Sequence, residues 1–99
     1  MTKTMPISID YCIEMARMVW ENRDNGTHAW LELADGRYLT IEPEQADFNE
    51  DVLEVILTPR TDMLGYAVDV LNICSIWSDD IDDDEALYKI FNYVLYGEE

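Results

Sequence analysis

The sequence predicts a single small α+β domain over residues 1–99, in which an antiparallel three-stranded sheet, made of a hairpin and one further strand, packs against about three helices. Three observations predict this class: an amphipathic helical stripe near the start, a glycine-centred hairpin pattern after it, and two further helical stripes in the second half. The expected order of elements is therefore α-β-β-β-α-α. Ninety-nine residues, 48% of them hydrophobic, suffice for one core and not for two.

Residues 8–23 are expected to form the first helix. Ser8 is a residue type that caps helix N-termini, and Gly26 follows the helix, where a left-handed residue can end it. The apolar positions recur at the steps of one helical stripe: Ile9, Cys12, Ile13, Ala16, Val19 and Trp20. The opposite face is polar, so this helix is expected to lie on the core with one side.

Residues 27–42 are expected to form a β-hairpin around Ala34-Asp35-Gly36. A two-residue loop would mix polar and apolar residues on both faces of the hairpin. A three-residue loop, with Gly36 in a left-handed bulge position, instead pairs Leu31 with Leu39 and Ala29 with Ile41. This register places the apolar residues on one face of the hairpin. The opposite face then carries His28, Trp30, Glu32, Tyr38, Thr40 and Glu42.

The next segment is expected to hold a polar connection and one strand. Pro43 is expected to stop the second strand, with residues 43–51 as the connection. Residues 52–57 are short and rich in β-branched side chains, which predicts a third strand, with a short helix as the alternative.

Two helices are expected to complete the chain. Residues 61–77 carry a helical stripe, although Gly65 weakens it by about 1 kcal/mol relative to Ala. Residues 83–96 carry another, with Asp82 and Glu85 arranged like a capping box and Gly97 in the position after the helix. The two stripes comprise Leu64, Ala67, Val68, Leu71, Cys74 and Ser75 in the first, and Leu87, Ile90, Phe91, Val94 and Leu95 in the second.

The net charge is the unusual feature of the chain. Twenty-two acids and six bases give −16, and residues 42–99 account for −14 of it with sixteen acids and two bases. Phosphate contacts need cations, so direct nucleic-acid binding is nearly excluded, and docking on an anionic membrane is disfavoured for the same reason. The chain shows no apolar run of membrane-spanning length and no signal-peptide pattern, so we expect a cytoplasmic protein. In that compartment Cys12 and Cys74 are expected to be reduced, with a disulfide as the alternative.

Residues 79–85 form the strongest local signal, because six of the seven are acidic. Asp80, Asp82 and Asp84 match the first positions of a calcium-binding loop, but the Gly at its sixth position and the Glu at its twelfth are missing. A magnesium-diphosphate pattern in the same run would require a large all-helical cavity. No metal site and no cofactor are therefore expected, with loose binding of a divalent cation as the alternative.

The acidic run can instead serve the fold or a partner. Acids at the start of a helix are each stabilised by about 0.3–1 kcal/mol through the macrodipole, which accounts for one or two of the six. The other acids could simply form a solvated acidic surface that serves solubility, and this is the alternative to a partner-binding role. Carboxylates about 5–6 Å apart can also imitate DNA, which carries one charge per about 1.7 Å of axis. Residues 42–54 add six further acids without a base. The candidate partner-binding residues are the acids of both segments, with Tyr88 as an anchor: Glu42, Glu44, Asp47, Glu50, Asp51, Glu54, Asp79, Asp80, Asp82, Asp83, Asp84, Glu85 and Tyr88.

Catalytic residues are not expected. His28 is the only histidine, and no Ser or Cys stands in a recognisable nucleophile motif. We therefore expect that the protein is not an enzyme.

In size, acidity and compact α+β pattern, the whole chain resembles small phage-encoded anti-defence proteins, the anti-CRISPR and anti-restriction DNA mimics. The resemblance lies in these overall properties and carries over no single residue. It implies a stoichiometric inhibitor, a monomer or small homodimer, that occupies the Lys/Arg-lined nucleic-acid channel of a basic effector such as a CRISPR–Cas complex or a nuclease. The alternatives are an immunity protein or antitoxin against a basic toxin, which needs the same charge, and a non-catalytic acidic adaptor.

Overall fold

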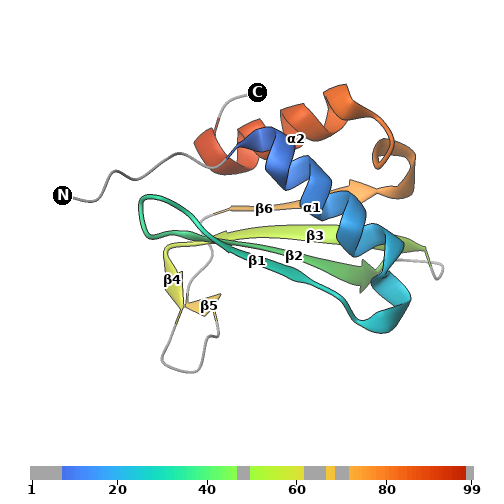
Figure 1. The fold of residues 1–99 in the computed structure, drawn as a ribbon, viewed down its shortest axis with the longest axis horizontal. Helices are drawn as coiled ribbons and strands as arrows, with labels where there is room; N and C mark the ends of the chain where they lie inside the picture. Colours follow the sequence, from blue (N-terminus) through green and yellow to red (C-terminus); the bar gives the residue numbers. More distant parts are fainter. Residues whose placement is uncertain (1–7, 47–49, 62–66, 69–71, 98–99) are drawn as a thin grey trace.

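The computed structural model describes residues 8–46, 50–61, 67–68 and 72–97. A four-stranded antiparallel sheet of order β1-β2-β3-β6 forms one layer, and two helices, α1 and α2, form the other (Figure 1). The elements are α1 (Ile9–Glu21), the 3-10 turn η1 (Arg23–Asn25), β1 (Ala29–Glu32), β2 (Tyr38–Gln45), β3 (Asp51–Thr58), β4 (Arg60–Thr61), β5 (Ala67–Val68), β6 (Asn72–Trp77), the 3-10 turn η3 (Ser78–Asp80) and α2 (Asp84–Tyr96).

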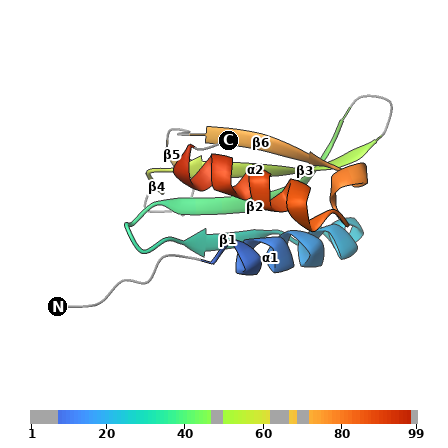
Figure 2. The same ribbon diagram turned by 90° about the horizontal axis from the view of Figure 1, so that it is seen from above.

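The α+β class is confirmed, but the predicted three strands and three helices are wrong. The described residues contain a four-stranded sheet and two α-helices, with β4 and β5 as a small separate pair. Seen from above, α1 lies along the β1 side of the sheet and α2 along the β3 and β6 side (Figure 2).

The first helix is confirmed. It begins after Ser8, whose extended backbone occupies the N-cap position, and it buries Cys12, Ile13, Ala16 and Val19. The following 3-10 turn ends at Gly26, which is left-handed with φ 72° as expected.

The hairpin has the predicted register. Leu31 pairs with Leu39, and Ala29 pairs with Ile41. Leu33 N–H donates to the carbonyl of residue 37 at 2.7 Å, and Gly36 takes the left-handed conformation with φ 91° that the three-residue loop needs. Matching of the apolar faces was therefore enough to choose the loop.

The prediction that Pro43 stops the second strand is wrong. β2 continues to Gln45, and Pro43 pairs with Leu53 of β3. The pairing between β1 and β2 begins at Ile41, so β2 is an edge strand at Pro43, where a missing N–H is tolerated.

The strand at 52–57 is confirmed and runs slightly longer, from Asp51 to Thr58. The helix predicted over 61–77 is wrong, because residues 72–77 form β6 and pair with β3. Cys74 and Ile76 of β6 face the core and Ile73 and Trp77 are exposed, an alternation of period two. The first part of the predicted stripe includes residues 62–66 and 69–71, which lie outside the described part.

The last helix is confirmed with a corrected start. Asp83, and not Asp82, is the N-cap, and its side chain accepts a hydrogen bond from Ala86 N–H at 3.1 Å. Gly97 ends the helix in a left-handed conformation with φ 71°.

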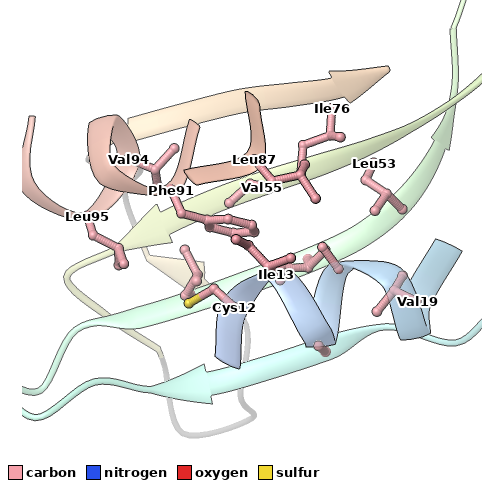
Figure 3. Close-up of a cluster of buried hydrophobic side chains, with 14 of the residues drawn as sticks. Cys12, Ile13, Val19, Leu53, Val55, Ile76, Leu87, Phe91, Val94 and Leu95 are labelled. Carbon is pink, nitrogen blue, oxygen red and sulfur yellow. The ribbon is translucent and has the colours of Figure 1, made fainter. Parts of the chain in front are cut away.

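The core lies between the helical layer and the covered face of the sheet. Phe91 of α2 fills its centre and faces Ile13 of α1 (Figure 3). Cys12 is buried in this core and Cys74 is partly buried, and both are free thiols. Desolvation raises the pKa of Cys12 to about 11.

Candidate partner-binding surface

The structure describes the side chains of Arg17, Arg23, Arg37 and Lys89, and each of these four is paired with an acid of the same chain. The pairs are Arg17–Asp84 at 2.6 Å, Arg23–Asp51 at 3.0 Å, Arg37–Asp35 at 2.6 Å and Lys89–Glu85 at 3.4 Å. None of these four cations is therefore left to neutralise the other surface carboxylates.

Three acids of the run at 79–85 stabilise the start of α2. Asp83 caps the helix, Asp84 pairs with Arg17, and Glu85 pairs with a lysine one turn later. Arg17 Nε also donates to the Ile81 carbonyl at 2.8 Å, which holds the run against α1. These three candidates have a structural role whether or not they also contact a partner.

The other three acids of the run have no such role. The side chains of Asp79, Asp80 and Asp82 form no ion pair or hydrogen bond with the described residues. Asp79 and Asp82 are exposed, and Asp80 is half-buried. These carboxylates remain free for an external cation.

The acids of residues 42–54 divide between the sheet and the β2–β3 connection. Glu50 is exposed, and Asp51 pairs with Arg23, whose guanidinium carbon also lies 4.0 Å from the centre of the Trp20 ring. Asp47 lies outside the described residues.

Glu42 and Glu54 are directly opposite each other on β2 and β3. Glu44 follows on the same face of β2, since alternate residues of a strand share a face. Burial and then the charges of Glu44 and Glu42 raise the pKa of Glu54. The carboxylates thus repel one another in the absence of a cation.

These three acids lie on the sheet face opposite the helices, which we call the open sheet face. It consists of the side chains that alternate with the core positions of the four strands. Its members are Trp30, Glu32, Tyr38, Thr40, Glu42, Glu44, Val52, Glu54, Ile56, Thr58, Ile73, Ser75 and Trp77. Val52 and Thr58 are buried, and the others are exposed or half-buried.

A row of three apolar side chains and one threonine, which we call the apolar row, crosses the open sheet face. Trp30, Thr40, Ile56 and Ile73 are consecutive cross-strand partners from β1 to β6. Trp30 also stacks on Tyr38, with ring centres 5.4 Å apart. The hairpin pattern placed Trp30 and Tyr38 on this face, whereas Ile73 was missed because its segment read as a helix.

Strand pairing brings both acidic segments to one end of the molecule. Val52 pairs with Trp77, so the start of β3 lies beside the end of β6, which leads into the acidic run (Figure 1). The run continues into the helical layer, whereas Glu42, Glu44 and Glu54 lie on the open sheet face. The acids therefore surround this end from both sides of the sheet.

A groove of about 630 Å³ lies between α1 and α2. Tyr88, 52% exposed, lines it together with Arg17. Five carboxylates also line it: Asp10, Glu14, Glu21, Asp84 and Glu85. Its character is acidic, like that of the neighbouring run.

Three further properties of the described part of the chain concern metal-binding clusters, its histidine and membrane-spanning helices. No three described His, Cys, Asp or Glu side chains are grouped to hold a metal ion. His28 is exposed. Among the described helices, none has the length and apolar character needed to cross a membrane.

No family model, curated protein or solved structure matches the chain.

Proposed function

We propose that the protein is a stoichiometric inhibitor of a nucleic-acid-binding effector in the host cytoplasm, and that it occupies a Lys/Arg-lined channel in place of DNA or RNA. One observation carries the proposal. The four described Lys and Arg side chains each form an internal ion pair in a chain of net charge −16, so none of them is left over to offset the unpaired carboxylates gathered at one end of it. A one-signed field of this kind accelerates encounter with a basic surface and repels nucleic acid.

The free acids Asp79, Asp80 and Asp82 support the encounter step. They are not needed for the ion pairs and the cap that start α2, so their charge acts outward. We expect a variant with Asn at these three positions to associate with the effector several-fold more slowly, because charges at the rim of an interface act mainly on the association rate. A matched control with the same charge change carries Asp10→Asn and Asp24→Asn together with Glu14→Gln on α1 and η1.

The test starts with capture of proteins on the immobilised chain from a lysate of cells that carry the gene. The captured protein is purified, and its nucleic-acid binding is measured with and without the inhibitor. We expect competition with DNA or RNA and a steep loss of affinity between low salt and about 1 M salt, where the Debye length is about 3 Å.

Salt-independent binding, or an effector that binds the chain and nucleic acid simultaneously, would refute the proposal. Capture of a toxin that does not act on nucleic acid would favour an immunity protein instead.

A further inference from the structure

We propose that the open sheet face is the docking surface and that an arginine-rich segment of the basic partner occupies it, with guanidinium groups stacked on Trp30 and Tyr38 and paired with Glu42 and Glu54. The inference rests on the proposed function, because it names the surface that the basic partner contacts.

The first argument is the apolar content of a face that no described helix covers. Trp30 is 51% exposed and Ile73 is 50% exposed, and the row through Thr40 and Ile56 connects them across all four strands. Cross-strand neighbours have Cβ atoms about 4.5–5.5 Å apart, so the row is continuous. Trp30 and Ile73 are exposed at the two ends of the row, and Thr40 and Ile56 between them are half-buried. Exposed large apolar side chains joined in one patch are typical of an interaction surface.

The second argument is the pair of carboxylates beside the apolar row. Glu42 and Glu54 are direct cross-strand partners, and no described cation pairs with either of them. Like charges placed opposite each other destabilise a sheet. A partner cation between the two glutamates would remove this repulsion, so charge complementarity identifies the occupant as basic.

The chain itself shows how such a site is filled. Arg23 lies over the Trp20 ring at 4.0 Å and pairs with Asp51 at 3.0 Å, so one guanidinium serves an aromatic ring and a carboxylate together. The open sheet face presents the same two chemical groups, with Trp30 and Glu42 in neighbouring rows, and none of the described side chains supplies an arginine to them. Arginine suits it better than lysine, because the planar guanidinium can stack and form a bidentate pair.

Charge also excludes the other occupants. A two-fold dimer whose axis passes near Glu42 and Glu54 would bring these carboxylates of one copy towards the same residues of the other. Nucleic-acid phosphates would meet these carboxylates as well. Of these three occupants, a basic partner is the one that suits both the apolar row and the acids.

The test is a titration of ¹⁵N-labelled protein with a nona-arginine peptide at low salt, followed residue by residue by NMR. The largest shifts are expected at the Trp30 indole N–H and along β1, β2 and β3. A nona-lysine peptide of the same charge is expected to bind about 2- to 5-fold more weakly, the factor that a lost cation–π contact gives. Shifts centred on residues 79–85 or on the α1–α2 groove, or equal affinity for both peptides, would overturn the inference.

Two matched pairs of variants locate the binding energy. Glu42→Gln/Glu54→Gln is expected to weaken the arginine peptide about tenfold, whereas Asp79→Asn/Asp82→Asn, with the same charge change, is expected to weaken it less than about threefold. These glutamine substitutions relieve repulsion, so they do not threaten the fold. Equal losses in the two double variants would overturn the inference.

The second pair compares aromatic residues of equal exposure. Trp30→Ala is expected to weaken the peptide about tenfold or more, as hot-spot residues do, and Tyr88→Ala, at 52% exposure, less than about twofold. A dimer in sedimentation that Trp30→Ala dissociates would identify a second copy as the occupant and refute the basic partner.

The outcomes separate this inference from the proposed function. If the peptide shifts only residues 79–85, the face is wrong but a basic partner is still supported. If the face binds arginine yet the captured effector does not compete with nucleic acid, the docking surface stands and the inhibitory function fails. No binding of either peptide at low salt would overturn the docking surface, and effector capture would then decide the function independently.

Discussion

Replacing Arg17 with Met is expected to lower the free energy of unfolding by about 1–2 kcal/mol. The hydrogen bond from Nε to the Ile81 carbonyl, 2.8 Å long and partly buried, contributes about 0.5–1.5 kcal/mol. The ion pair with Asp84, 2.6 Å long, contributes about 0.2–1 kcal/mol, because the Asp84 side chain is 82% exposed and solvent screens it. Methionine keeps most of the apolar stem, so packing changes little.

The assay is thermal and urea unfolding of the wild type, Arg17→Met and Lys89→Met at low and high salt. For a domain of this size about 1 kcal/mol corresponds to about 4–8 °C in Tm. Lys89→Met removes only the exposed ion pair with Glu85, one helical turn away, and is expected to lower the free energy of unfolding by less than about 0.5 kcal/mol. Salt should shrink the Arg17→Met difference without abolishing it, since the hydrogen bond is not screened. An Arg17→Met variant as stable as wild type, or no more destabilised than Lys89→Met, would refute the reasoning.

Three further predictions concern single side chains. Glu54→Gln should raise the free energy of unfolding by about 0.2–1 kcal/mol at neutral pH. The folded-state pKa of Glu54 is raised above its ordinary 4.5, so the wild type loses stability as the pH rises from 4.5 through the folded-state pKa. The gain should therefore vanish below pH 4.5 in a pH series of urea unfolding curves. Asp83→Ala should cost about 0.5–2 kcal/mol through loss of the cap, and Asp82→Ala much less, which the same unfolding curves would measure; equal costs would contradict the assigned cap. Cys12, whose pKa is raised to about 11 by burial, should resist alkylation in the folded protein while Cys74 reacts first, as mass spectrometry of timed samples would show; faster labelling of Cys12 would contradict the core arrangement.

Local patterns were sufficient for the elements whose faces are distinct. The stripe of α1, the stripe of α2 and the hairpin register each separate apolar from polar residues in one way only. Leu31 opposite Leu39 is an example: the alternative loop would have placed polar residues in the core.

Local patterns failed where a distant strand decides the outcome. Residues 72–77 fit a helical stripe through Cys74, but β3 needs a partner on its second edge, and β6 supplies it. Pro43 reads as a strand breaker, but it is tolerated because β1 does not reach that far along β2. In each case the pairing of another strand, which is absent from the local sequence, outweighs the local preference.

The candidate site shows the same division. The sequence alone determined the net charge of −16, its concentration in residues 42–99, and the polar hairpin face that carries Trp30 and Glu42. The tertiary structure decided which acids serve the fold, placed Glu54 opposite Glu42, and completed the apolar row with Ile73 of β6. The physical reason is that charge and amphipathicity are properties of a segment, whereas ion pairing and a continuous surface across four strands depend on which segments become neighbours.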